Sequence, residues 1–600
     1  MDELKERSEI SELYKWDLSS LFASDAAFEE ALDAIDDKIA AAAAFRGRLH
    51  SAEEILAFLK ADEEAGLAMS QLFSYSSLRK SEDTRDSKAL GMYSRVYGKY
   101  AAFAGATAFA EPEFLANDEE TLQAIVADER LQDYTFKLND LLRRKPHTLS
   151  AGEEKLLAGL AEALGAPQFA AEALMDTDLV FDSVLNEKGE TIPLNNANYI
   201  PLQMDNDRTL RKNSFQAYYK SYKQHINTFA AAYTGVLKAQ AAEAQARGYA
   251  SARAMALAAD NIPESVYDTL VETVHAHMDL MYRYLRLRRR ILKVDELHYY
   301  DVYAPLCAEA AAKVSYEEAQ KLVLAAVKPL GTDYVGQVQK AFEQRWIDVY
   351  PNKGKSGGAY SDGCYTSYKN LMANYTDTLN DVSMIAHEMG HSMHSWYTAN
   401  SQPYHYSDYS MFVAEVASTV NENLLNDSLL AACTDPKEKL ALLNERLEGF
   451  KGTVYRQTMF AEFEMKAAAM AMKGDPTNAE ALCSLYEDLV RLYFGDEFVI
   501  DEEVRYEWSR IPHFYFPFYV FVYATGYCSA AAIAEMLKDG NEQKVKEYKE
   551  FLSMGGSRYP LDELKHAGVD LTSAAPLEIA LKKFENVLAE AEKTADELGL

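Results

Sequence analysis

Three histidines within one ten-residue stretch are the strongest chemical signal in this 600-residue chain. The stretch is "AHEMGHSMHS", in which His387 and His391 are four residues apart and Glu388 follows the first directly. On an α-helix, side chains four residues apart lie on one face. Two imidazoles placed in this way can bind one zinc ion, and a glutamate beside them can act as a general base. The spacing therefore predicts the HExxH arrangement of a zinc hydrolase.

The residues around this motif predict the helix that it needs. Thr378 has an acidic residue, Asp381, three positions later, which is a variant of the N-terminal capping pattern. Apolar residues then recur every three or four positions as far as Trp396. Gly390, inside the motif, is small enough to let another segment of the chain approach.

A zinc site in a hydrolase needs a third protein ligand, and this ligand lies outside the motif. The metzincin pattern would need glycine at position 394 and histidine at 397, where this chain has His394 and Tyr397. Glu415 is an acid within the apolar run of a second predicted helix, residues 409–427. A buried carboxylate needs a partner, and zinc would be one. Glu422, two turns later on the same face, could orient a ligand histidine.

Two further histidines call for an interpretation. His394 lies one turn beyond His391, where it either supports the ligands from the second shell or merely packs. His513 begins the aromatic segment "HFYFPFYVFVYATGY". In that segment Tyr519, Tyr523 and the histidine could point hydrogen-bond donors at one place, as catalysis through an oxyanion requires. The alternative is ordinary aromatic packing in a core.

A loop of small residues precedes the segment "YKNLMANYTD", in the only region dense in loops and strands. An edge strand here could bind an extended peptide through backbone hydrogen bonds, and an ordinary surface loop is the alternative. The candidate substrate-binding residues are Gly357, Gly358, Ala359, Tyr360, Asn374 and Tyr375.

Most of the remaining sequence has helical periodicity, so the predicted fold class is mainly α. The alternating residues of "LVFDSVLNEKGETIPL", 179–194, predict a β-hairpin. We place a boundary there, with an N-terminal helical region at 1–195 that ends in the hairpin and a catalytic region at 196–600.

Composition narrows the possible partners and the location. The formal net charge of −32 argues against nucleic acid, because phosphates would be repelled. No apolar run is long enough to span a membrane, and the first twenty residues do not resemble a signal peptide. Five scattered cysteines without a CxxC pair fit a reducing compartment. We expect a cytoplasmic protein with no obligate protein partner.

The stretch "HEMGHSMHS", followed 24 residues after His391 by Glu415 in "FVAEVASTVNE", resembles the thimet-oligopeptidase-like zinc peptidases. The bacterial oligoendopeptidase F branch is the most similar, and "YKWDLSSLF", "YYDVYAPL", "SGGAYS" and "IPHFYFPFYVFVYATG" agree with it. The resemblance implies a helical two-lobed shell around a deep channel, with a small β region beside one zinc ion. It also implies roles for particular residues: ligands His387, His391 and Glu415, the catalytic Glu388, the supporting Glu422, and oxyanion donors His513 and Tyr519, then Tyr523.

The resemblance predicts an intracellular zinc-dependent oligoendopeptidase, which cuts internal bonds of short unstructured peptides with Glu388 as general base. Within enzymes, the alternative is an exopeptidase of the dipeptidyl carboxypeptidase type on the same scaffold. From another class, the alternative is a peptide-binding protein that kept the fold and lost catalysis.

Overall fold

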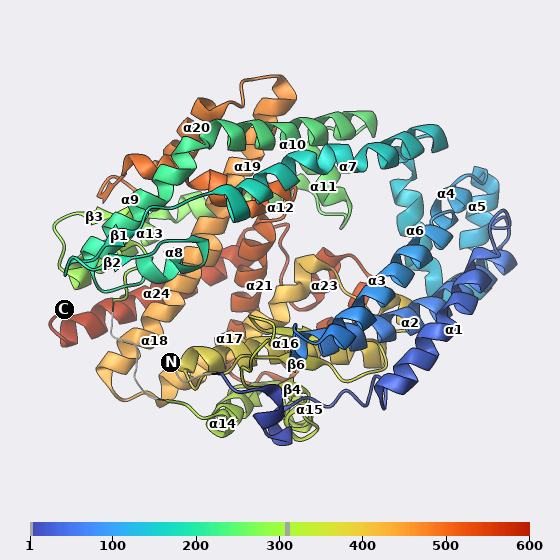
Figure 1. The fold of residues 1–600 in the computed structure, drawn as a ribbon, viewed down its shortest axis with the longest axis horizontal. Helices are drawn as coiled ribbons and strands as arrows, with labels where there is room; N and C mark the ends of the chain where they lie inside the picture. The colour runs from blue at the N-terminus through green and yellow to red at the C-terminus, as the bar shows by residue number, and fades with distance from the viewer. Residues whose placement is uncertain (1–3, 307–312) are drawn as a thin grey trace. The chain divides into compact units, whose positions relative to one another are not determined.

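Helices dominate the computed structural model, which describes residues 4–306 and 313–600 (Figure 1). This confirms the predicted mainly α class. The chain forms two compact units, each made of three segments: Met1–Thr148, Ala312–Ser428 and Ile533–Val569 in the first, and Leu149–Ala311, Leu429–Ala532 and Asp570–Leu600 in the second. This division differs from the predicted boundary at residue 195, which falls inside the second unit.

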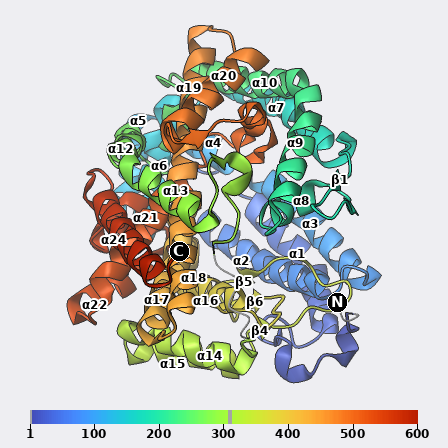
Figure 2. The same cartoon turned by 90° about the vertical axis from the view of Figure 1, so that its left-hand side faces the viewer.

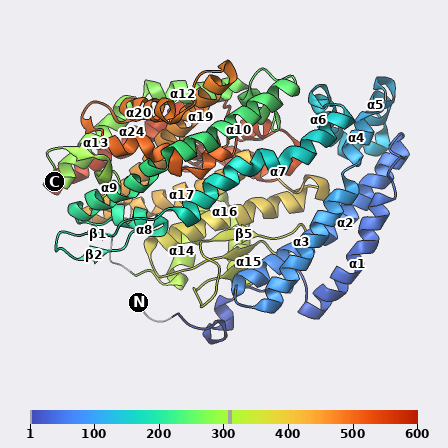
Figure 3. The same cartoon turned by 45° about the horizontal axis from the view of Figure 1, so that its top comes forward.

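The first unit begins with three long helices that pack on one another, α1, α2 and α3 (Figure 3). Their inward faces carry large apolar residues, which form one core cluster with Trp16 and Met372. The helices of the unit are α1 Asp25–Ala43, α2 Ala52–Glu82, α3 Ser87–Thr107, α4 Ala110–Leu115, α5 Glu119–Val126, α6 Thr135–Arg144, α14 Tyr316–Ala326, α15 Thr332–Glu343, α16 Leu379–Ser401, α17 Met411–Ala432, α22 Glu542–Leu552 and α23 Pro560–His566, and the unit's boundary cuts α17 after Ser428.

A small three-stranded sheet packs against α16 in this unit (Figure 2). Its strands are β4 Ile347–Asp348, β5 Tyr360–Asp362 and β6 Asn370–Met372, in the order β4-β6-β5. β6 pairs with β4 in parallel and with β5 in antiparallel fashion, so β5 forms an edge. The predicted β region next to the motif helix is confirmed.

The second unit is built around α10, which packs along α7 and against α19. The unit also has two short two-stranded sheets. β3 and β7, which are far apart in the sequence, pair in parallel, and the neighbouring strands β1 and β2 pair in antiparallel fashion. The elements are α7 Ala151–Ala173, β1 Val184–Leu185, β2 Thr191–Ile192, α8 Asn196–Gln203, α9 Arg208–Gln224, α10 Ile226–Ala246, α11 Ala252–Ala258, α12 Glu264–Ala276, α13 Met278–Leu292, β3 Leu297–His298, α18 Pro436–Gly449, α19 Arg456–Lys473, α20 Ala479–Phe494, β7 Phe498–Val499, α21 Phe521–Leu537 (whose last residues, from Ile533, belong to the first unit) and α24 Ala575–Glu597.

The predicted hairpin is present at β1 and β2. Val184 pairs with Ile192 and Leu185 with Thr191, so the turn spans residues 186–190. Gly189 in this turn has a φ of +77°, a left-handed conformation that glycine adopts without steric cost. Turn chemistry and alternation together were therefore sufficient to locate this element.

Two findings bear on the expected environment of the chain. Among the described residues, none of the helices combines the length and the apolarity needed to cross a bilayer. Cys364, Cys433, Cys483 and Cys528 are free thiols, whereas Cys307 lies outside the described residues.

Helix α16 approaches the backbone of α17 closely at Gly390. A Cβ atom added to Gly390 would lie 2.5 Å from the Cα atom of Ser418 and 2.7 Å from the carbonyl oxygen of Ala417. Real Cβ atoms do not come this close to backbone, so only glycine permits the crossing. The predicted role of Gly390 as a point of close approach is confirmed.

We expect Gly390→Ala to lower the free energy of unfolding by about 1–3 kcal/mol, because the extra methyl group overpacks two helix backbones. Denaturant unfolding of the metal-free protein, followed by circular dichroism, measures this loss. Gly336→Ala in α15 is the matched control, since nothing lies within 4 Å of its added Cβ atom. Equal stability of the two variants would contradict the inference that the helix backbones touch at Gly390.

Candidate functional site

The helix that carries the motif, α16, is fixed at its amino-terminal end by the predicted capping pattern. The Thr378 hydroxyl accepts a hydrogen bond from the backbone N–H of Asp381, and the Asp381 carboxylate accepts one from the N–H of Thr378. The same carboxylate oxygen also accepts from the N–H and the hydroxyl of Thr376, both at 2.9 Å. These hydrogen bonds thus tie the first turn of α16 to the loop that connects it with β6.

Three side-chain atoms from α16 and α17 converge on one point. Nε2 of His387 lies 3.2 Å from Nε2 of His391, and these two atoms lie 3.4 and 3.5 Å from Oε2 of Glu415. Tetrahedral zinc with bonds of about 2.1 Å requires ligand atoms about 3.4 Å apart. The observed spacing fits one zinc ion held by these residues, the one such cluster of donor atoms among the described residues.

The orientation of His387 shows why this point favours a cation. Its Nδ1 atom lies 2.9 Å from a carboxylate oxygen of Glu422, which can only accept a hydrogen bond when ionised. Nδ1 therefore carries a proton, and Nε2 is the nitrogen that faces the other two donor atoms. Burial alone lowers the pKa of His387, but the carboxylates of Glu415 and Glu422 outweigh it and raise that pKa to about 10.

The two glutamates nearest the convergence point have different surroundings. Glu415 receives a hydrogen bond of 3.2 Å from the Ser418 hydroxyl, and its contacts with His387 and His391 lower its pKa. Glu388 is only 8% exposed, and burial raises the pKa of its carboxyl group. A raised pKa is typical of a carboxylate that takes up and gives back a proton near neutral pH.

His394 packs and does not support the ligands. It is fully buried, and its ring stacks on Tyr409 with centroids 3.7 Å apart. Neither ring nitrogen has a hydrogen-bond partner in the part of the chain that the structure describes, and burial lowers the pKa of His394 to about 3. Of the two interpretations of His394, these contacts favour packing, because a neutral imidazole between aromatic rings orients no ligand.

The candidate substrate-binding residues divide into two kinds. The loop at Gly357 and Gly358 is exposed, and the Asn374 amide holds it by donating to the carbonyl oxygens of Ser356 and Gly358, both at 2.9 Å. Tyr375, in contrast, is 1% exposed, and its hydroxyl donates to the Val314 carbonyl. This burial argues against direct contact between the Tyr375 side chain and a substrate.

The edge strand β5 follows this loop. Tyr360 packs its ring against the core of the first three helices, so its backbone and not its side chain is available at the edge. Ala359, just before it, is partly exposed. The Ser361 hydroxyl lies 2.8 Å from the hydroxyl of Ser392, which follows His391 on α16. This contact fixes the strand beside the candidate metal ligands.

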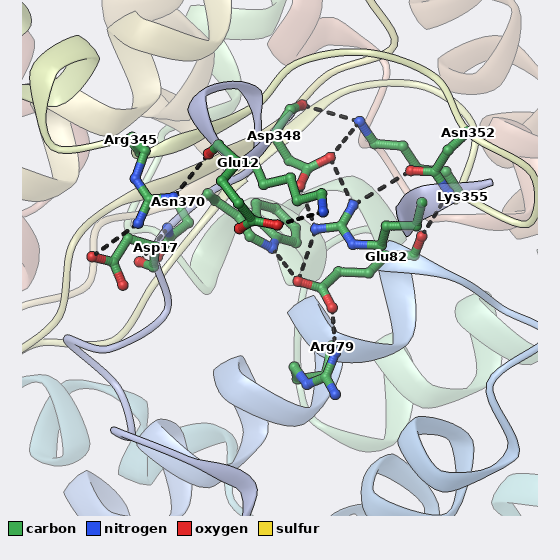
Figure 4. A network of polar contacts seen from close by, with 12 residues as sticks. Glu12, Asp17, Arg79, Glu82, Arg345, Asp348, Asn352, Lys355 and Asn370 are labelled. Atoms are coloured by element: carbon green, nitrogen blue, oxygen red, sulfur yellow. Dashed lines mark hydrogen bonds and ion pairs between the residues drawn. The ribbon is translucent and has the colours of Figure 1, made fainter. Parts of the chain in front are cut away.

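A buried polar network forms around Asp348 and Lys355, just before the glycine loop in the chain (Figure 4). The ammonium group of Lys355 pairs with Asp348 at 2.7 Å and donates to the carbonyl oxygens of Tyr350 and Ala373. The guanidinium group of Arg7 donates two hydrogen bonds to the same aspartate. The segment just before the glycine loop is thus fixed by buried ion pairs and hydrogen bonds.

The predicted donor cluster also forms, and its members belong to the second unit. The Tyr523 hydroxyl lies 3.3 Å from Nε2 of His513, and the rings of His513 and Tyr519 are nearly parallel, with centroids 6.3 Å apart. All three side chains are partly exposed. Burial lowers the pKa of His513, so this imidazole is neutral at physiological pH.

Sequence reasoning missed Asn421, which joins three helices. Its buried amide donates to the Ala386 carbonyl on α16 at 3.1 Å and accepts a hydrogen bond from the Tyr334 hydroxyl of α15. The sequence did contain a sign of this role. Asn421 is a polar residue in an apolar run, directly before Glu422, and a buried polar side chain needs a hydrogen-bond partner, as Glu415 does.

Comparisons with known sequences agree along nearly the whole chain. The model of peptidase family M3 matches residues 202–583, and a model described as oligopeptidase F matches residues 113–181. Oligopeptidase PepF of Bacillus subtilis (strain 168) is 41% identical over 594 residues, which cover 99% of this chain and 89% of that protein.

Solved structures agree as well. Oligoendopeptidase-F from Enterococcus faecium is 33% identical, with a TM-score of 0.74, over 96% of this chain and 99% of that one. A crystal structure of a Chlamydophila abortus protein, also 33% identical, has a TM-score of 0.94 and covers 99% of this chain and all of that one. Sequence and fold together show that this chain belongs to peptidase family M3, among the metallopeptidases of the oligoendopeptidase F group.

Proposed function

We propose that this peptidase is a zinc-dependent oligoendopeptidase that cuts internal bonds of short, unstructured peptides. The observation that carries the proposal is the convergence of Nε2 of His387, Nε2 of His391 and Oε2 of Glu415 at tetrahedral spacing. The relatives that are named oligopeptidase and oligoendopeptidase support the choice of short peptides as substrates. A cytoplasmic location remains a prediction from the scattered free cysteines.

Zinc bound at these ligands would supply Lewis acidity, which polarises a carbonyl group and lowers the pKa of water. Glu422 accepts a hydrogen bond from Nδ1–H of His387, which directs Nε2 of that ring toward the position that zinc would occupy. The Glu388 carboxylate takes a proton from the attacking water and delivers it to the leaving amine nitrogen. The edge of β5 offers backbone groups to an extended peptide.

The part played by the donor cluster comes from the family resemblance. We propose that His513 and Tyr519, with Tyr523 behind them, donate hydrogen bonds to the oxyanion that forms on the attacked carbonyl. The neutral state of His513 supports this role, since its ring keeps one N–H group to donate. The contact between His513 and Tyr523 orients that ring.

We expect Glu388→Gln to keep zinc and to lower kcat at least about 100-fold, because the amide cannot carry the proton. Assays on a quenched fluorescent peptide and metal analysis of the same sample measure both effects. Glu578→Gln, an exposed site on α24, is the control and should match the parent. Substantial residual turnover in Glu388→Gln would remove the residue from the mechanism.

The ligand set is tested by metal affinity and not by activity. We expect Glu422→Gln to weaken zinc binding about 10–100-fold through the loss of its contact with His387, and Glu415→Ala to weaken it further. Competition with a chromogenic chelator measures both affinities. Parent-like affinity in Glu415→Ala would exclude it as a ligand.

The type of cleavage separates the proposal from its alternatives. A peptide blocked by acetyl and amide groups should be cut internally, and zinc chelation should stop the reaction. Mass spectrometry of the products checks this. Removal of dipeptides from free carboxyl termini alone would indicate an exopeptidase, and binding without cleavage would indicate a silent peptide-binding protein.

A further inference from the structure

One residue beside the donor cluster has an uncommon backbone conformation. Phe518, directly before Tyr519, has a φ of +53°. Large side chains rarely adopt this left-handed region, and such residues persist only where their surroundings hold them. The chain here leaves a short helical turn at Pro512–Tyr515 and enters α21 at Phe521. The conformation of Phe518 therefore sets the direction in which Tyr519 leaves the turn.

A buried carboxyl group holds this residue. Glu464, on α19, is 2% exposed, and its Oε1 atom accepts a hydrogen bond of 2.6 Å from the backbone N–H of Phe518. Its Oε2 atom has no partner within the described part of the chain. A buried carboxyl group with a single contact is costly to keep, so that contact calls for an explanation.

The ring of Phe518 is held as firmly as its backbone. It is 3% exposed and packs edge-on against Tyr267, with centroids 6.0 Å apart. The hydroxyl of Tyr267 in turn donates to the carbonyl oxygen of Ala461 on α19. Phe518 is therefore held from two sides, by the carboxyl group of Glu464 on α19 and by the ring of Tyr267 on α12.

The other members of the cluster do not depend on Phe518 in the same way. His513 belongs to the short helical turn, and Tyr523 belongs to α21. Tyr519 lies between these elements, so a change at Phe518 would move it relative to the other two. The nearly parallel arrangement of the His513 and Tyr519 rings is the feature that would be lost.

We propose that Glu464 is a positioning residue for peptide hydrolysis, which holds Phe518 in the left-handed conformation that places Tyr519 beside His513. The proposal rests on the proposed function, since it assigns Tyr519 a part in the reaction. Glu464 acts through the backbone of Phe518 and does not itself touch the substrate.

The chemistry of Glu464 suggests a rescuing substitution. Burial raises its pKa well above the ordinary value, so the group is a neutral acid whose carbonyl oxygen accepts the hydrogen bond. Glutamine has the same shape and offers the same acceptor. Methionine has a similar length but lacks an acceptor of comparable strength.

We expect Glu464→Gln to keep kcat within about threefold of the parent, and Glu464→Met to lower kcat about 10- to 100-fold with little change in KM. The double variant Glu464→Met with Tyr519→Phe should lose little beyond Tyr519→Phe alone, because both act through one hydroxyl group. Zinc content should stay constant in all of them. Multiplicative losses in the double variant, or equal activities of Glu464→Gln and Glu464→Met, would overturn the proposal.

A matched control lies two residues away on the same helix. Glu462 is also 2% exposed, but it contacts His275 and Tyr493 and not the Phe518 turn. Glu462→Met should therefore lower the melting temperature without lowering kcat. If Glu464→Met does not fold, Glu464→Asp serves instead, since its shorter side chain withdraws the acceptor from Phe518. The aspartate variant should show the same loss of kcat.

Hydrogen exchange separates this proposal from the proposed function. Glu464→Met should accelerate amide exchange in peptides that cover residues 512–520, and Glu464→Gln should restore protection. Exchange there that stays at the parent level in Glu464→Met would overturn the positioning role. If the parent does not cut blocked peptides, the proposed function fails, and the exchange experiment still decides whether Glu464 holds the turn.

Discussion

The geometry of the candidate metal site depends on the close approach of two helix backbones at Gly390. His387 and His391 come from α16 and Glu415 from α17, so the spacing of their donor atoms is set by how the helices cross. A side chain at position 390 would push the Ser418 backbone away and carry Glu415 with it. The amide of Asn421 holds the same crossing through Ala386. The absence of a side chain at Gly390 therefore sets the distances between His387, His391 and Glu415, which lie within about one turn of the crossing.

Two imidazole nitrogens and a carboxylate oxygen converge at a point that favours a cation. The three atoms lie within 3.5 Å of one another, and the carboxylates of Glu415 and Glu422 raise the pKa of His387. The surrounding residues increase this preference: Glu422 adds negative charge behind His387, and Ser418 holds Glu415 in place. A divalent cation at this point would take the place of the Nε2 proton and interact with the same carboxylates, which is a physical basis for metal affinity.

Much of this site could be predicted from the sequence, because many of its residues lie close together in the chain and within one helix. The spacing of His387 and His391, and the capping pair Thr378 and Asp381, lie within one helix, where position in the chain fixes position in space. The hairpin at residues 184–192 was likewise readable from alternation and turn residues. Both readings of His394 stayed open in the sequence, because helical spacing shows which residues share a face, but not which aromatic rings cover that face.

The division of the chain and the control of Tyr519 could not be read in this way. Each unit is made of three segments, and no local pattern indicates which segments pack together. Phe518 adopts a conformation that its own sequence disfavours, and the group that holds it, Glu464, is 54 residues earlier. A regular helix places its residues by period, whereas an irregular turn needs a partner from elsewhere in the fold. Metal ligands on helices are therefore visible in a sequence before their supporting structure is known. Donor groups on turns become visible only when the tertiary contacts that hold the turn are found.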